Sequence, residues 1–205
     1  MGETKQMIKL KDILMERISD VVYHFTKTEA ADNIIATNRF RLSHLVQDTP
    51  RARVFDPGKK YEEGYYMSVS RTKIEGYTLN TPPSSCHYAR FELDGTKLGN
   101  KYKGGAYNYW DKMAQHSNDY EEYEDRIYST DMYITNALSY IKRLDVDVSR
   151  KCSSFDTGKL IRTATRANVP TFLYPSREKW AQQSGGVEVR DVDGYKLFMQ
   201  SLKTI

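Results

Sequence analysis

Short β-strand patterns run through most of this chain, and helical patterns interrupt them at irregular intervals. Runs of β-branched and aromatic residues predict strands at residues 21–25, 40–42, 65–70, 86–93, 122–128, 144–148 and 169–174. Apolar residues at helical spacing predict helices over residues 8–18, 30–36, 136–143, 158–166, 176–183 and 194–202. Because strands and helices do not alternate strictly, this order predicts an α+β fold and not a doubly wound parallel sheet.

Local signals predict where several of these elements begin and end. A hydroxyl at Thr26 or Thr28 would cap the helix over residues 30–36, and Asn38 would end it. Asp94 and Gly95 predict a turn after the strand over residues 86–93. Ser176 would cap the helix that follows it.

The composition predicts a single globular domain with a modest core. The chain has 205 residues, 39% of them hydrophobic, and its 16 tyrosines can build core while keeping a hydroxyl at a wet surface. We expect one domain over residues 1–205, with an N-terminal helix in residues 1–19. Residues 131–205 are expected to form a C-terminal extension of helices and strands.

Charge, cysteine content and hydropathy limit the partners and the compartment. The net charge of +4 permits contact with nucleic acid without requiring it, and the densest basic segment, Arg39 to Arg41 with Arg51 and Arg53, is most simply ordinary surface. No apolar run is long enough to span a bilayer. Cys86 and Cys152 form no Cys-x-x-Cys pair, so we expect two thiols in a reducing cytoplasm and no membrane contact.

His24 directly follows the apolar residues of the first predicted strand, in the segment Tyr23-His24-Phe25-Thr26. One interpretation is a core histidine satisfied by a single hydrogen bond. The other is a fixed imidazole donor to a ligand hydroxyl, such as that of a ribose. The sequence leaves both open.

The segment from Gly64 to Thr72 predicts a strand with one polar face. Side chains alternate along a strand, so Tyr66, Ser68 and Ser70 share one face, and Met67 and Val69 lie on the other. The polar face suits a wall that contacts a planar ring and a sugar. The alternative is a half-exposed strand whose hydroxyls meet water.

Glu122 and Glu124 are two residues apart in a predicted strand, so both carboxylates would point to the same side. A carboxylate in a cleft can stabilise an oxocarbenium-like sugar, as carboxylates do in glycoside cleavage. The alternative is a solvated edge strand in which Arg126 compensates the charge.

Several other classes of site are absent from the sequence. There is no phosphate-binding loop of the Gly-x-x-x-x-Gly-Lys type, no dinucleotide Gly-x-Gly-x-x-Gly and no His-Glu-x-x-His zinc helix. We therefore expect no metal site. Asp145 and Asp147 would suit a cation, but a solvated strand is the default expectation for them.

Taken in order, the three motifs resemble those of the ADP-ribosyltransferase fold. The Tyr23 to Thr26 segment resembles the His-bearing first strand of the diphtheria-toxin-like branch. Residues 64–77 resemble the Gly-x-Tyr-Phe-Ala…Ser-x-Ser-x-x-Tyr run of poly(ADP-ribose) polymerases. Glu122 and Glu124 resemble the Glu-x-Glu strand of arginine-directed toxins. The resemblance implies a split, antiparallel-rich β-sheet core with flanking helices.

The resemblance also implies an activity: transfer of ADP-ribose from NAD, the cosubstrate, to a protein or nucleic-acid acceptor. Glu124 would be catalytic, and Glu122 also fits that slot. The residues that would hold NAD are His24, Phe25, Thr26, Tyr66, Ser68, Ser70, Tyr77, Arg41 and Arg71.

The chain departs from the family pattern at Phe25, where a glycine usually follows the histidine. Two alternatives are a non-enzymatic phage or host-interaction protein on the same fold, and an NAD glycohydrolase that uses water as acceptor. Residues 7–14 resemble the start of many tailed-phage proteins, which would imply a viral origin and action in the host cytoplasm.

Overall fold

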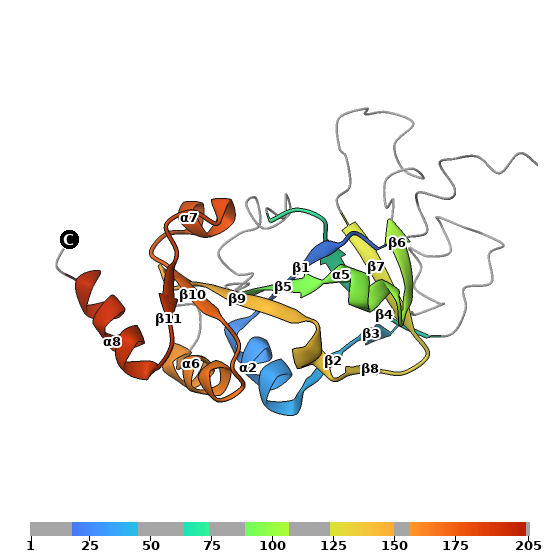
Figure 1. Ribbon diagram of the computed structural model, residues 1–205, viewed down its shortest axis with the longest axis horizontal. Helices are drawn as coiled ribbons and strands as arrows, with labels where there is room; N and C mark the ends of the chain where they lie inside the picture. The colour runs from blue at the N-terminus through green and yellow to red at the C-terminus, as the bar shows by residue number, and fades with distance from the viewer. Residues whose placement is uncertain (1–17, 45–63, 74–88, 107–123, 150–155, 204–205) are drawn as a thin grey trace, which may run out of the picture.

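The computed structural model describes residues 18–44, 64–73, 89–106, 124–149 and 156–203 (Figure 1). The strands in these ranges are β1 (Val21–Thr26), β2 (Arg39–Arg41), β3 (Ser43–His44), β4 (Tyr65–Ser70), β5 (Ala89–Asp94), β6 (Lys103–Ala106), β7 (Glu124–Ser129), β8 (Tyr133–Thr135), β9 (Ile141–Asp147), β10 (Thr171–Tyr174) and β11 (Val187–Val189). The helices are α2 (Thr28–Thr37), α5 (Gly95–Gly99), α6 (Thr157–Arg166), α7 (Arg177–Gln182) and α8 (Val192–Ser201), with a 3-10 turn η1 (Ala137–Ser139).

Within the described residues, nine strands form one sheet and two form a small ribbon. The order across the large sheet is β11-β10-β9-β5-β1-β4-β7-β6, with β3 paired to β4, and the ribbon is β2-β8. The pairs in the large sheet are antiparallel except β9 with β10, which are parallel. The helix α6 connects these two strands, as a parallel pair requires. A large, mostly antiparallel sheet with flanking helices confirms the predicted α+β class.

Helices lie on both sides of the sheet: α2 and α6 on one side and α7 on the other (Figure 1). The main core joins buried residues of the central strands, such as Phe91 and Leu144, to Ile34 of α2 and Leu160 of α6. On the α7 side a smaller cluster forms around Trp180, whose side chain is almost fully buried.

Side-chain caps fix the start of most helices. Asp156 accepts a hydrogen bond from the Gly158 amide at the start of α6, and Ser176 accepts one from the Lys179 amide at the start of α7. The predicted cap by Thr26 or Thr28 is wrong, because Lys27 occupies the cap position of α2 without a side-chain bond. Asn38 ends α2 in the left-handed conformation, as predicted.

Two predicted elements differ in the structure. Residues 136–143 do not form a helix, because Ile141 already belongs to β9, which pairs with β5 and β10. Asp94 and Gly95 do not make a hairpin turn: the Asp94 carboxylate accepts a hydrogen bond from the Lys97 amide and caps α5. Tertiary pairing and a local cap override the sequence pattern at these positions.

Residues of the predicted C-terminal extension supply β9, β10 and β11, so this part completes the large sheet. The predicted N-terminal helix in residues 1–19 lies almost wholly outside the described residues, as do Cys86 and Cys152. In the described part of the chain, no helix has the length and apolar character needed to cross a bilayer.

Candidate functional site

The strands that carry the three sequence motifs are consecutive neighbours, in the order β1, β4, β7. The described residues of β1 and β4 are joined by one paired position, Tyr23 with Ser70, whereas β1 pairs with β5 along its whole length. A side chain adds a second link between β1 and β4, since His24 Nδ1 lies 3.2 Å from the Ser68 carbonyl oxygen. Because a carbonyl oxygen only accepts, Nδ1 is the donor in this bond.

The register places His24 and the hydroxyl-bearing residues of β4 on opposite faces of the sheet. Directly paired residues share a face, so Tyr23 lies on the side of Ser70, Ser68 and Tyr66. His24 pairs instead with Phe91 and lies on the other side, where its ring meets the edge of Phe40 at a centroid distance of 5.7 Å. The structure therefore brings the strands of His24 and Tyr66 together, but not the two side chains.

The two residues after His24 occupy different surroundings. The Phe25 ring packs against Trp180 of α7, with ring centroids 5.7 Å apart and planes at 78°. Thr26 ends β1, where it pairs with Ala89 and is half-buried. Phe25 thus fills the space between β1 and α7.

The polar face of β4 continues onto β7. Ser70 is directly paired with Glu124, and Ser68 with Arg126. The Arg126 guanidinium carbon lies 4.4 Å from the Tyr66 ring centroid, in the range of a cation–π contact. Ser70 is buried, and its hydroxyl accepts a hydrogen bond of 3.1 Å from the Thr72 amide.

The remaining predicted site residues do not converge on this face. Arg71 forms an ion pair with the buried Asp125. Its Nε lies 2.7 Å and a terminal nitrogen lies 2.6 Å from Asp125 Oδ1. Arg41 is exposed on β2, in the separate ribbon. Tyr77 and Glu122 lie outside the described residues.

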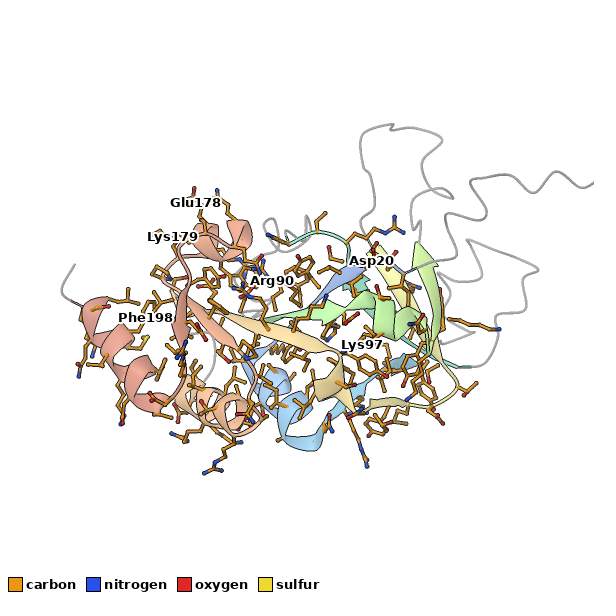
Figure 2. The ribbon with its side chains drawn as sticks, viewed as in Figure 1. Asp20, Arg90, Lys97, Glu178, Lys179 and Phe198 are labelled. Carbon is orange, nitrogen blue, oxygen red and sulfur yellow. The ribbon has the colours of Figure 1, made fainter. Side chains whose placement is uncertain are left out.

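A buried polar network on the α7 side of the sheet was missed by sequence analysis. At its centre is Arg90, whose side chain is fully buried. Its guanidinium donates to Asp145 Oδ2 at 2.6 and 3.1 Å and to the Lys73 carbonyl at 2.6 Å. Arg90 lies near the middle of the molecule in Figure 2, and its guanidinium carbon is 4.8 Å from the Trp180 ring centroid.

The Asp145 carboxylate accepts hydrogen bonds from several further side chains. Arg143 Nε lies 2.9 Å from its Oδ1, Gln183 Nε2 lies 2.8 Å from its Oδ2, and the Tyr174 hydroxyl lies 3.3 Å from its Oδ1. The expectation of a solvated strand at Asp145 and Asp147 is wrong, because both side chains are buried. The signal in the sequence was the charged residues that alternate with apolar ones in β5 and β9.

Asp147 is the least satisfied member of this region. Its Oδ1 accepts hydrogen bonds from the amide and hydroxyl of Ser149. Among the described residues its buried Oδ2 has no hydrogen-bond partner, and a terminal nitrogen of Arg177 is 3.9 Å away. No group of three or more His, Cys, Asp or Glu side chains is placed to hold a metal ion in the described ranges.

The Tyr174 phenol gives a pH-dependent prediction. Burial, followed by the charge of Asp145, raises the pKa of Tyr174 from 10.0 to about 12. The unfolded chain therefore releases this proton at lower pH than the folded chain, so the stabilisation is present below pH 10 and is lost as the pH rises to 12. We expect the Tyr174 contribution to the free energy of unfolding to fall by about 2–3 kcal/mol over this window.

Urea unfolding measured at intervals from pH 9 to pH 12 tests this expectation. The Tyr174→Phe variant keeps the ring and removes the titrating group, so its stability should fall less steeply over the same window. Equal slopes for both proteins would contradict the assignment.

Comparison with known proteins gives no relative to guide the interpretation: no protein-family model, no curated protein and no solved structure matches this chain.

Proposed function

We propose that this protein transfers ADP-ribose from NAD to a macromolecular acceptor, on an ADP-ribosyltransferase-type sheet. One observation supports the proposal most strongly. The three strands that carry the motifs, far apart in the sequence, are adjacent in the order β1, β4, β7, and Ser70 is directly paired with Glu124. The single paired position between β1 and β4 is also in keeping with a split sheet.

In this proposal NAD lies on the face that bears Tyr66, Ser68 and Ser70. The nicotinamide ring stacks on Tyr66 after Arg126 leaves the ring face that it now covers. The displaced guanidinium then pairs with the diphosphate, for which its planar fork is suited. Arg71 takes no part in phosphate binding, since Asp125 already holds it.

The reaction breaks the bond between ribose C1′ and the nicotinamide nitrogen, and the electron pair leaves with nicotinamide. Glu124 stabilises the positive charge that develops on the sugar. A nucleophilic atom of the acceptor forms the new bond to C1′ and gives its proton to a base, a role for which Glu122 is the candidate.

His24 acts as a positioning residue in this scheme. Its bond to the Ser68 carbonyl fixes β4 relative to β1 from the opposite face. It does not contact the ribose of NAD, which separates this proposal from the role that the family resemblance implies.

Incubation with NAD labelled on its adenylate phosphate, together with protein and RNA acceptors, tests the proposal. We expect Glu124→Gln to lower label transfer at least tenfold, because the amide cannot stabilise a cationic sugar as a carboxylate can. Glu188→Gln is the matched control: Glu188 is exposed on β11, where it pairs with Arg190. This variant should label acceptors as the unmodified protein does.

The same reaction distinguishes the alternatives. Release of free nicotinamide without labelled acceptor would select an NAD glycohydrolase. The enzyme proposal is wrong if the unmodified protein does not consume NAD and its melting temperature does not rise when NAD is added. A non-enzymatic role would then take its place.

A further inference from the structure

The two-stranded ribbon of β2 and β8 has one buried face and one exposed face. Its directly paired positions are Arg39 with Thr135, Phe40 with Ile134, and Arg41 with Tyr133. The central pair is buried in the main core, with exposed fractions of 1% and 0%. The two flanking pairs are exposed, and these four residues are called the ribbon face below.

The ribbon face carries positive charge that no carboxylate of the described residues neutralises. Arg39 and Arg41 are two residues apart on one strand, so their Cα atoms are separated by about 6.6 Å. Neither forms an ion pair in the described part of the chain. By contrast, Arg71, Arg90, Arg143, Arg162 and Arg177 each lie within ion-pair distance of an aspartate.

An aromatic ring lies beside these two charges. Tyr133 is 39% exposed and is among the exposed large hydrophobic residues of the described part of the chain. The guanidinium carbon of Arg39 is 6.0 Å from its ring centroid. An exposed planar ring beside two cations forms a surface on which a nucleobase can stack while the arginines reach phosphates.

The ribbon is held firmly at both ends. The Leu42 amide donates to the Met132 carbonyl at 2.9 Å, and the Ala137 amide donates to the Asn38 carbonyl at 3.1 Å. Beneath it, Phe40 packs edge-on against Phe91 of the main sheet, with centroids 6.1 Å apart. The exposed side chains are therefore presented on fixed backbone and do not themselves hold the ribbon together.

We infer that the ribbon face binds single-stranded nucleic acid, with Arg39 and Arg41 on phosphates and Tyr133 against a base. A single strand fits better than a duplex because the base faces of a duplex are already stacked and cannot reach Tyr133. The inference concerns binding alone and does not depend on the proposed transfer of ADP-ribose.

Fluorescence anisotropy with a labelled oligothymidylate, in the absence of NAD, tests the inference. Replacing Arg39 and Arg41 by alanine should weaken binding at least tenfold. It should also make the slope of log K against log salt shallower by about 1.4, since each phosphate contact on a single strand contributes about 0.7. Tyr133→Ala should weaken binding at least fivefold through lost stacking.

A second pair of substitutions controls for net charge. Arg166→Ala with Lys203→Ala also removes two exposed positive charges, but from the end of α6 and the turn after α8. This protein should bind within twofold of the unmodified one. Circular dichroism should show all variants folded, and Arg39→Lys with Arg41→Lys should restore the salt slope.

Three results would overturn the inference. One is no binding of the oligonucleotide by the unmodified protein at low salt. Another is an equal loss of binding in the Arg166 and Lys203 control. The third is binding of polyglutamate with the same affinity as the oligonucleotide, if alanine in place of Arg39 and Arg41 also abolishes that binding. This result would make the ribbon face a site for acidic polypeptides.

Discussion

Alanine in place of Asp145 is expected to lower the free energy of unfolding by about 3–5 kcal/mol. The side chains of Asp145 and Arg90 are both fully buried, and their closest atoms are 2.6 Å apart. Without the carboxylate, the Arg90 guanidinium stays buried, and the Lys73 carbonyl is its one remaining hydrogen-bond acceptor among the residues that the structure describes. An uncompensated buried charge is far more costly than the net gain from an ion pair. Urea unfolding followed by tryptophan fluorescence measures the loss.

The matched control is Glu188→Ala, which breaks the exposed pair of Glu188 with Arg190. Exposed pairs contribute about 0–1 kcal/mol, so this variant should remain close to the unmodified protein. A double variant, Asp145→Leu with Arg90→Met, should recover much of the stability that Asp145→Ala loses, because it leaves no buried charge. If Asp145→Ala costs less than about 1 kcal/mol, Arg90 is hydrated in solution and the network is not buried as described.

The parts of the fold that the sequence predicted are those specified locally. The helix α6 buries Leu160, Ile161 and Ala164, so its apolar positions repeat at helical spacing. The strand β4 was predicted from its alternating pattern. The helix predicted over residues 136–143 is wrong because the apolar positions there fit a helix and a strand equally well. Only the pairing of β9 with β5 and β10 decides between the two.

In the candidate site, too, the sequence predicted the features that are specified locally. Alternation along β4 correctly grouped Tyr66, Ser68 and Ser70 on one face. The face of His24 depends on how β1 pairs with β4 and β5, and a shift of one residue in register moves a side chain to the other side. No local pattern records that register. The partnership of Arg90 with Asp145 is equally non-local, since the two residues are 55 positions apart.

Alanine in place of Gly95 is expected to lower the melting temperature by about 6–12 °C, which corresponds to about 3 kcal/mol for a chain of this size. Gly95 is buried at the start of α5, and its amide donates to the Asp20 carbonyl at 2.9 Å. An added Cβ would lie 3.0 Å from the Ser19 carbonyl carbon and 3.2 Å from that of Asp20, and closer still to the Ser19 oxygen. These are backbone atoms, so no side-chain rotation relieves the overlap. The helix α5 must move away from the chain that enters β1.

Gly99→Ala, at the other end of the same helix, is the matched control for the Gly95 substitution. There the added Cβ would meet Ile18 side-chain atoms at 3.7 and 3.9 Å, which is ordinary van der Waals contact. Both substitutions gain the same advantage of alanine over glycine in a helix, about 0.5–1 kcal/mol. The difference between the two melting temperatures, measured by differential scanning calorimetry, therefore isolates the contact at Gly95. Equal melting temperatures would mean that α5 does not pack against the Ser19 backbone in solution.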